Sequence, residues 1–143
     1  MNELDQFVKH KLKAKYYVRY TDDFAIVHND IEHLKILVNT IEIFLNNRLN
    51  LKLHPDKIVV RKSSQGVDFL GYVILPNYQV VRTKTKDRAF RKMKQKIKEY
   101  KTGKITEDLL KQTLNSYLGV FSHANTYKLT QKFKNQYWFW LKE

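Results

Sequence analysis

The stretch YVRYTDDFAIV, residues 17–27, decides the fold. It sets two adjacent carboxylates, Asp22 and Asp23, between two runs of residues that favour the β conformation. Alternating side chains predict one strand over residues 16–20, and a second strand is predicted over residues 24–28. Two strands joined by so short a connection predict a β-hairpin with both carboxylates at its tip.

The tip of this hairpin contains no glycine, although tight hairpin turns require positive φ at one or two positions. Asp tolerates the left-handed region better than most residues, so one interpretation is an ordinary Asp turn on the surface. Two neighbouring carboxylates also repel each other, and a divalent cation would turn that repulsion into binding. The second interpretation is therefore a metal site.

The segments around the hairpin predict an α+β fold. A helix is predicted over residues 2–13, and Asn29 or Asp30 is placed to cap a second helix. That second helix carries one apolar stripe, formed by Ile31, Leu34, Leu37, Val38, Ile41, Phe44 and Leu45. The segment LNLKLHPDKIVV, residues 49–60, predicts a turn and then a short strand from Ile58. The segment QGVDFLGYVILPNYQVV, residues 65–81, predicts a further hairpin.

The pattern becomes helical from Thr85. One helix carries an apolar stripe, with Gly103 placed to end it, a second opens at Thr106, and a third is predicted from Asn125 to Trp140. The predicted stripe of the first helix consists of Ala89, Phe90, Met93, Ile97 and Tyr100. This change predicts two domains, residues 1–83 and residues 84–143.

Charge is distributed unevenly over the 143 residues. The chain has a formal net charge of +13, and residues 84–143 contribute 15 basic against five acidic residues. A field this positive favours a polyanion such as nucleic acid, although a basic helical face is often only a solvated surface. Cysteine is absent, so metal binding would have to use oxygen or imidazole ligands. No signal peptide or membrane span is predicted, and a soluble cytoplasmic protein is the default expectation.

The motifs YVRYTDDFAIV, LNLKLHPDKIVV and GVDFLGYVI, in this order and with a helix after the first, resemble successive blocks of reverse transcriptases. The likeness is strongest to bacterial retroelement enzymes of the group II intron and diversity-generating types. It implies that residues 1–83 form the C-terminal part of a polymerase palm and residues 84–143 an all-helical basic thumb. In such enzymes two Mg²⁺ ions act on the primer 3′-hydroxyl and the attacked triphosphate.

The resemblance implies roles for single residues. Asp22 would be the principal metal ligand of this hairpin, with Asp23 beside it. Tyr20 would support the turn near the primer end, although a core aromatic in a strand is an equal alternative. Lys57 would lie near the leaving pyrophosphate as a general acid or a charge stabiliser, although a lysine there is more often plain surface.

The resemblance also implies where nucleic acid binds. The backbone of Phe69, Leu70 and Gly71 would form a primer grip, an assignment compatible with a buried strand that has a bulge at Gly71. The first thumb helix would contact phosphates of an RNA template and DNA primer duplex. The basic residues assigned to that contact are Lys84, Arg88, Arg91, Lys92, Lys96 and Lys98.

One departure from the family pattern is large. Only 19 residues precede Tyr20, whereas family members carry a further metal-binding Asp and the fingers upstream. Glu3 and Asp5 match no such motif. The expectation is a C-terminal portion that is inactive alone, that uses dNTP only when an upstream fragment completes it, and that could self-associate. The alternative is a non-catalytic, maturase-type module that binds duplex or structured RNA.

Overall fold

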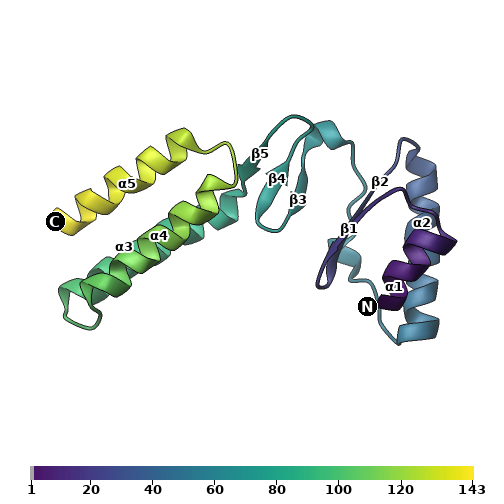
Figure 1. Ribbon diagram of the computed structural model, residues 1–143, viewed down its shortest axis with the longest axis horizontal. Helices are drawn as coiled ribbons and strands as arrows, with labels where there is room; N and C mark the ends of the chain where they lie inside the picture. The colour runs from purple at the N-terminus through teal and green to yellow at the C-terminus, as the bar shows by residue number, and fades with distance from the viewer. Residues whose placement is uncertain (1) are drawn as a thin grey trace. The chain divides into compact units, whose positions relative to one another are not determined.

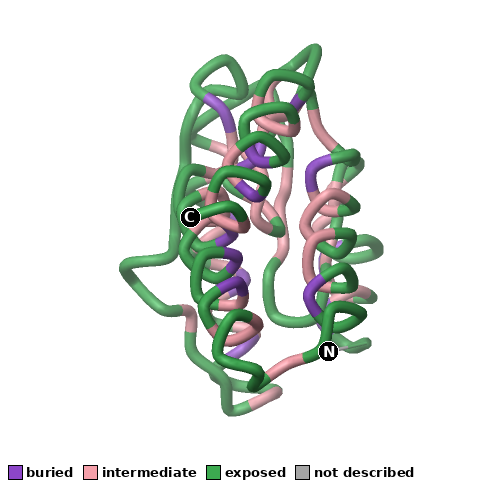
Figure 2. The backbone as a smooth tube through the Cα atoms, turned by 90° about the vertical axis from the view of Figure 1, so that its left-hand side faces the viewer, coloured by how far each residue is buried: buried purple, intermediate pink, exposed green. Residues whose placement is uncertain are grey.

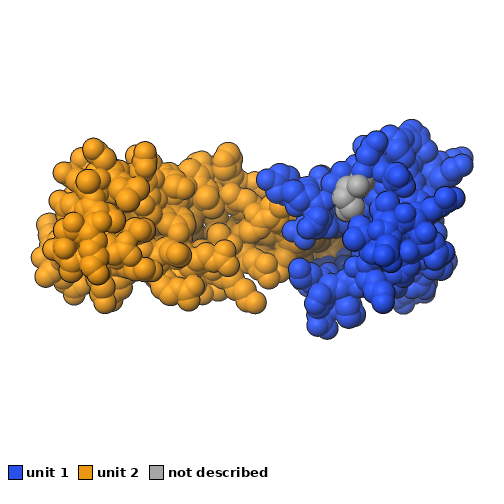
Figure 3. Space-filling model, turned by 90° about the horizontal axis from the view of Figure 1, so that it is seen from below, with its two compact units in different colours: residues 1–61 blue, residues 62–143 orange. Residues whose placement is uncertain are grey.

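The computed structural model describes residues 2–143, and it has the predicted α+β fold with a helical C-terminal part (Figure 1). The chain divides into two compact units, Met1–Arg61 and Lys62–Glu143 (Figure 3). The boundary between the two units is set by which residues contact one another. The palm and thumb division after residue 83 is a functional one and stays a prediction.

The first unit begins with helix α1 (Asn2–Gln6), which continues as a π-helical segment, η1 (Phe7–Lys11). The predicted hairpin follows as strands β1 (Tyr16–Tyr20) and β2 (Asp23–Val27). The strands are antiparallel, and their pairing runs from Tyr16 opposite Val27 to Tyr20 opposite Asp23. The first strand is confirmed residue for residue, and the second begins one residue earlier than predicted.

Helix α2 (Ile31–Phe44) comes next and continues as a π-helical segment, η2 (Leu45–Leu49). Of the two predicted caps, Asn29 and Asp30, the structure uses Asp30, whose carboxylate accepts a hydrogen bond from the Glu32 backbone N–H at 2.9 Å. Leu37, Ile41 and Leu45 of the predicted stripe are buried. The core of this unit is small, because the cluster that joins α1, η1, α2 and η2 contains only Leu4, Val8, Ile41 and Leu45 as buried members.

The short strand predicted from Ile58 is wrong. The chain instead makes one 3₁₀ turn, η3 (Pro55–Lys57), and then runs without regular structure to the 3₁₀ turn η4 (Ser63–Gln65). A strand needs a hydrogen-bonding neighbour, and β1 and β2 pair only with each other among the described residues. Ile58, Val59 and Val60 are left partly or largely exposed.

The second unit begins with a three-stranded antiparallel sheet of β3 (Val67–Phe69), β4 (Tyr72–Ile74) and β5 (Gln79–Val81). The predicted hairpin is thus confirmed, and a third strand joins it. The sheet is tied to the helices that follow: the Tyr72 hydroxyl donates to the Val120 carbonyl at 2.8 Å, and the Asn125 N–H donates to the Gln79 carbonyl at 2.8 Å.

Three helices complete this unit: α3 (Thr83–Lys101), α4 (Glu107–Ser122) and α5 (Tyr127–Lys142). Helix α3 ends at Lys101, and Gly103, the residue predicted to end it, follows the cap with φ +71°. The Gly103 N–H donates to the Tyr100 carbonyl and the Lys104 N–H to the Glu99 carbonyl, a Schellman motif. Thr106 caps α4 through the Leu109 N–H, and α5 lies two residues later than predicted.

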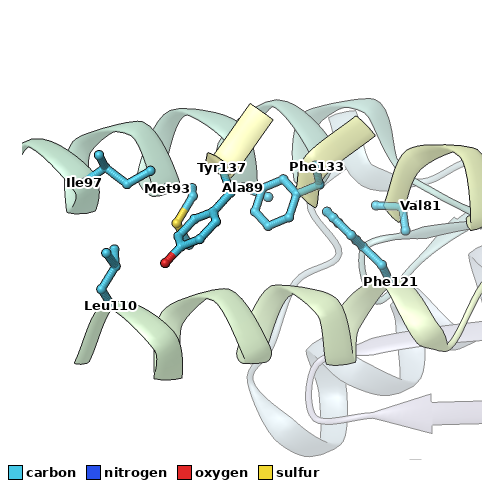
Figure 4. Close-up of a cluster of buried hydrophobic side chains, with 8 residues drawn as sticks. All are labelled: Val81, Ala89, Met93, Ile97, Leu110, Phe121, Phe133 and Tyr137. Carbon is cyan, nitrogen blue, oxygen red and sulfur yellow. The ribbon is translucent and has the colours of Figure 1, made fainter. Parts of the chain in front are cut away.

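The core of the second unit lies between these helices (Figure 4). Aromatic rings from α5 and α4 meet edge to face, with the Phe121 and Phe133 centroids 5.1 Å apart. Buried residues occupy the inner sides of the helices and exposed residues the outer sides (Figure 2). The buried members are Val81, Ala89, Met93, Ile97, Leu110, Phe121, Phe133 and Tyr137. Within residues 2–143, none of the helices has the length and apolar character that a membrane crossing requires.

Candidate active site

The hairpin tip consists of a two-residue turn, Thr21 and Asp22, between the paired residues Tyr20 and Asp23. Thr21 has φ +51°, and neither aspartate has positive φ. Positive φ at the first central position alone is the pattern of a type II′ turn, where glycine is the favoured residue. The expectation that Asp would occupy the left-handed position is therefore wrong. Aspartate is not needed here for the backbone conformation.

Both carboxylates are exposed. Within residues 2–143, neither one takes part in an ion pair or a side-chain hydrogen bond. Adjacent, unpaired oxygen ligands are what a hard divalent cation requires. The described residues nevertheless contain no group of three or more acidic, His or Cys side chains arranged to hold a metal. Asp22 and Asp23 therefore fit part of a magnesium coordination sphere.

Arg19 connects the turn to the N-terminal helix. Its Nε donates to Asp5 Oδ1 at 2.8 Å and its Nη2 to Asp5 Oδ2 at 2.5 Å, a bidentate ion pair. Its Nη1 donates to the Thr21 carbonyl at 2.8 Å. The guanidinium thus holds the residue with the unusual φ against α1.

The Asp5 carboxylate is engaged on several sides, since the Tyr17 hydroxyl also donates to Oδ1 at 2.7 Å. The hydrogen bonds from Arg19 and Tyr17 hold the pKa of Asp5 well below its usual range. Burial and the nearby Asp5 raise the pKa of Tyr17 to about 12. Asp5 is therefore the partner of Arg19, which agrees with its failure to match a metal-binding motif.

Sequence reasoning missed Arg19 as a functional candidate. The sequence held one signal: alternation along β1 puts Arg19 on the same side as Tyr17. In the structure both side chains are half-buried, while their neighbours are exposed. A charged side chain on the covered face of a strand requires a partner. The sequence did not indicate that the partner would be Asp5, 14 residues away.

Tyr20 is 59% exposed, so the alternative that made it a core aromatic is wrong. It shares the uncovered face of β1 with Tyr16 and Val18, which are also exposed. Lys57 is exposed and ends the 3₁₀ turn η3, where its backbone N–H donates to the His54 carbonyl at 2.9 Å. No hydrogen bond or ion pair joins the Lys57 side chain to the hairpin carboxylates in the described part of the chain.

The predicted primer-grip residues occupy the β3–β4 hairpin. Leu70 (φ +51°) and Gly71 (φ +87°) form its two-residue turn, and positive φ at both positions is the type I′ pattern. The strand pairing is regular, so the bulge considered at Gly71 is wrong. A Cβ at Gly71 would lie 3.3 Å from Thr85 Oγ1, and the Gly71 carbonyl accepts from the Arg82 N–H at 2.9 Å. The hairpin tip thus packs on the first turn of α3.

Helix α3 carries the predicted basic residues. Lys84, Arg88, Arg91, Lys92 and Lys98 are exposed, whereas Lys96 is half-buried. Lys96 Nζ lies 2.7 Å from Glu99 Oε2, so this lysine is already paired, and the contact lowers the pKa of Glu99. Lys84, Arg88, Arg91 and Lys98 recur at helical spacing opposite the buried Ala89, Met93 and Ile97. These four form the outward basic face of α3.

Comparison with known proteins identifies relatives of part of this chain. The COX1/OXI3 intron 2 protein of Saccharomyces cerevisiae is 41% identical over 64 residues, 42% of this chain and 7% of that protein. The group II intron-encoded protein LtrA of Lactococcus lactis subsp. cremoris is 38% identical over 63 residues, 43% of this chain and 10% of LtrA. The match therefore spans a small part of each relative.

The family described as reverse transcriptase (RNA-dependent DNA polymerase) matches residues 1–74. This range is just over half of the chain, and it contains the aspartate hairpin, η3 and the β3–β4 turn. Together with the relatives encoded by introns, the match shows that the chain belongs to the reverse transcriptase family, of the retroelement type.

Proposed function

We propose that this chain supplies part of the palm and the thumb of an RNA-directed DNA polymerase, with Asp22 and Asp23 as metal-binding carboxylates. The observation that carries the proposal is the hairpin tip. Two adjacent carboxylates are exposed and unpaired there, on a turn that Arg19 braces through the Thr21 carbonyl. Surface aspartates that only terminate a turn need no such support.

The two aspartates at this tip have different proposed roles. Asp22 is the principal ligand and Asp23 shapes the site beside it. Mg²⁺, when bound, supplies the positive charge that activates the primer 3′-hydroxyl and stabilises the leaving pyrophosphate. No third acidic, His or Cys side chain is grouped with this pair in the described residues, so a complete magnesium site would need a further ligand.

The proposed primer contacts lie in both units. Tyr20 is exposed and pairs with Asp23 at the end of the hairpin, and it would contact the primer end. The turn of Phe69, Leu70 and Gly71 would hold the primer strand through its backbone, and exposed Lys57 would meet the leaving pyrophosphate. The packing of Gly71 on Thr85 supports the role of this turn within the second unit, since it makes the turn continuous with the first proposed thumb helix.

The outward basic face of α3 would contact phosphates of the template–primer duplex. Arginine and lysine at helical spacing on one exposed face give a sequence-independent contact of the kind a polymerase needs. Lys92 flanks this face, and Lys96 contributes less because Glu99 occupies it. On this proposal residues 1–83 act as palm and residues 84–143 as thumb.

A second candidate function is a non-catalytic module that binds duplex or structured RNA. The incomplete set of metal ligands favours it, because Asp22 and Asp23 alone hold Mg²⁺ weakly. The two functions share the basic face of α3 and differ in whether the carboxylates are used.

Primer extension in a complemented assembly tests the proposal. The 143-residue chain would be mixed with a fragment that carries the fingers and the upstream palm of a related group II intron protein, together with an RNA template, a DNA primer and dNTPs. Extension that needs both parts supports the polymerase. Duplex binding without extension in any mixture supports the non-catalytic module.

A further inference from the structure

Helix α5 carries large aromatic side chains on two sides. Its inner side packs on the core of the second unit through Leu129, Phe133, Tyr137, Trp140 and Leu141. Its outer side carries three large aromatic residues that solvent reaches: Tyr127 is 77% exposed, and Trp138 and Phe139 are each 57% exposed. A surface helix normally keeps its outer side polar. Exposed aromatics gathered on one helix mark a binding surface.

The residues between these aromatics are polar and regularly spaced. Tyr127, Gln131, Asn135 and Phe139 follow one another at intervals of four, so they form a row that winds gradually around the helix. Lys128, Lys132 and Gln136 lie beside that row, and these seven residues together line one shallow depression. We call this set the outer face of α5. From Tyr127 to Phe139 it is about 18 Å long, the span of about five stacked nucleotides.

The charge of the outer face is of one sign. Helix α5 contains four lysines and no acidic residue from Tyr127 to Lys142. Lys128 and Lys132 have no ion-pair partner in the described part of the chain. They also line a second depression that continues past Tyr127 to Lys86 on α3, with Asp87 as its one acidic residue. The cations are therefore available to an external anion.

We propose that the outer face of α5 binds an unpaired RNA strand. Aromatic rings separated along a basic surface stack on bases without reading their sequence, and lysines beside them neutralise phosphates. Tyr127 and Phe139 would stack, while Lys128 and Lys132 would meet the backbone. The Gln131 and Asn135 amides both donate and accept hydrogen bonds, which suits the 2′-hydroxyl that distinguishes RNA from DNA.

This assignment goes beyond the proposed polymerase function and uses different residues. The duplex proposal rests on the outward basic face of α3, which offers cations but no exposed aromatic rings. An apolar protein partner would leave Lys128 and Lys132 without counter-charges on burial, which costs free energy. A polyanion with π faces satisfies both the aromatics and the lysines.

Fluorescence anisotropy of the full chain with a labelled 12-mer of uridine tests the proposal. Tyr127→Ala with Phe139→Ala should weaken binding about tenfold or more, because each lost stacking contact carries a large share of the affinity. Tyr78→Ala is the matched control: Tyr78 is 52% exposed in the same unit but lies outside the outer face, so affinity should not change. Tyr127→Ala alone, at the most exposed position, provides a second variant if the double variant fails to fold.

The lysines give a separate readout. Lys128→Gln with Lys132→Gln should lower the slope of log affinity against log salt by about 1.4, whereas the aromatic substitutions should leave the slope unchanged. Arg88→Gln with Arg91→Gln should weaken duplex binding and spare the uridine 12-mer, so the two surfaces can fail independently.

Several results would overturn the proposal. If the aromatic double variant binds the uridine 12-mer as tightly as the native chain does, the strand binds elsewhere. Equal affinity for a deoxyuridine 12-mer would overturn the assignment to RNA. If sedimentation velocity shows that the native chain is a dimer and the aromatic double variant is a monomer, a second copy of the chain covers this face.

Discussion

At the scale of single residues, the hairpin tip combines an unfavourable conformation with a strong brace. Thr21 is β-branched and has φ +51°, a conformation that costs roughly 1–2 kcal/mol for residues other than glycine. Arg19 holds the Thr21 carbonyl while it forms a bidentate ion pair with Asp5. Strain that persists under such support is typical of functional sites. The orientation of Asp22 and Asp23 therefore depends on a residue in α1.

The first prediction concerns the strain at Thr21. Thr21→Gly should stabilise the first unit by about 0.5–1 kcal/mol, because glycine adopts positive φ freely and its entropy cost offsets only part of the gain. Thr40→Gly is the control. Thr40 lies inside α2, where glycine lowers helix stability, so this change should destabilise the same unit. Hydrogen exchange of the β1 and β2 amides measures both. Faster exchange in Thr21→Gly would show that Thr21 is not strained.

The second prediction concerns Asp5 and pH. Its folded-state pKa is lowered, so its ion pair adds stability above the ordinary carboxyl pKa of about 3.9 and loses that contribution as pH falls through the lowered folded value. Asp5→Asn should therefore destabilise the first unit near pH 6, and its deficit relative to the native chain should shrink below about pH 4.

NMR signals of the hairpin during thermal unfolding provide the measurement for this second prediction. Both tryptophans, Trp138 and Trp140, lie in the second unit, so tryptophan fluorescence in the same samples is an internal control that should not change. A deficit that is constant from pH 6 to pH 2 would mean that the Asp5 carboxylate does not stabilise the fold as an anion.

At the scale of elements, local patterns predicted what local interactions decide. Alternation over residues 16–20, the Asp30 cap and the Gly103 stop are short-range features, and each forms where the sequence placed it. The strand expected from Ile58 depended on a distant hydrogen-bonding partner that the local sequence cannot specify. The same limit explains why Arg19 was missed, because Arg19 finds its partner Asp5 only when α1 packs beside β1.

The two hairpin turns show a second limit of sequence reasoning. Thr21 and Leu70 both take positive φ, although neither residue favours it. Propensity alone assigned the left-handed position of the first turn to aspartate, but the strand pairing fixes the turn length and places Thr21 there. The register of β1 and β2 therefore decides which residue takes positive φ, even against the conformational preference of Thr21.

The third prediction concerns the outward basic face of α3. Replacement of Lys84, Arg88 and Arg91 by Gln should lower the salt slope of RNA–DNA duplex binding by about 2.7, because each lost phosphate contact contributes about 0.9. The same change at Lys9, Lys11 and Lys13, which are exposed in the first unit, should have less effect. Filter binding across a salt series measures the slopes. Equal slopes for the two triple variants would indicate that only net charge matters.

At the scale of the whole chain, the two units carry different parts of the proposed activity. The carboxylates belong to the first unit, while the primer-grip turn and the basic helix belong to the second. Binding and chemistry can therefore be separated by substitution. The main buried cluster of the first unit has four members, against eight in the second unit.

The fourth prediction uses this separation. In the 143-residue chain alone, Asp22→Asn should leave duplex affinity almost unchanged or slightly higher, because it removes a negative charge near phosphates and no cation-binding surface. Primer extension should be absent with either version of the chain, since Asp22 and Asp23 provide too few ligands to displace water from Mg²⁺. Anisotropy with a labelled RNA–DNA duplex measures the affinity.

The same substitution should act differently in the complemented assembly. There, Asp22→Asn should abolish nucleotide addition while duplex binding persists, because the lost carboxylate would hold the Mg²⁺ that would supply positive charge to the reacting groups. Asp56→Asn is the matched control: Asp56 is an exposed carboxylate of the same unit, outside the hairpin, and its loss should leave extension intact. Full activity of Asp22→Asn, or robust polymerase activity from the purified 143-residue chain, would exclude the metal-binding role proposed for the hairpin.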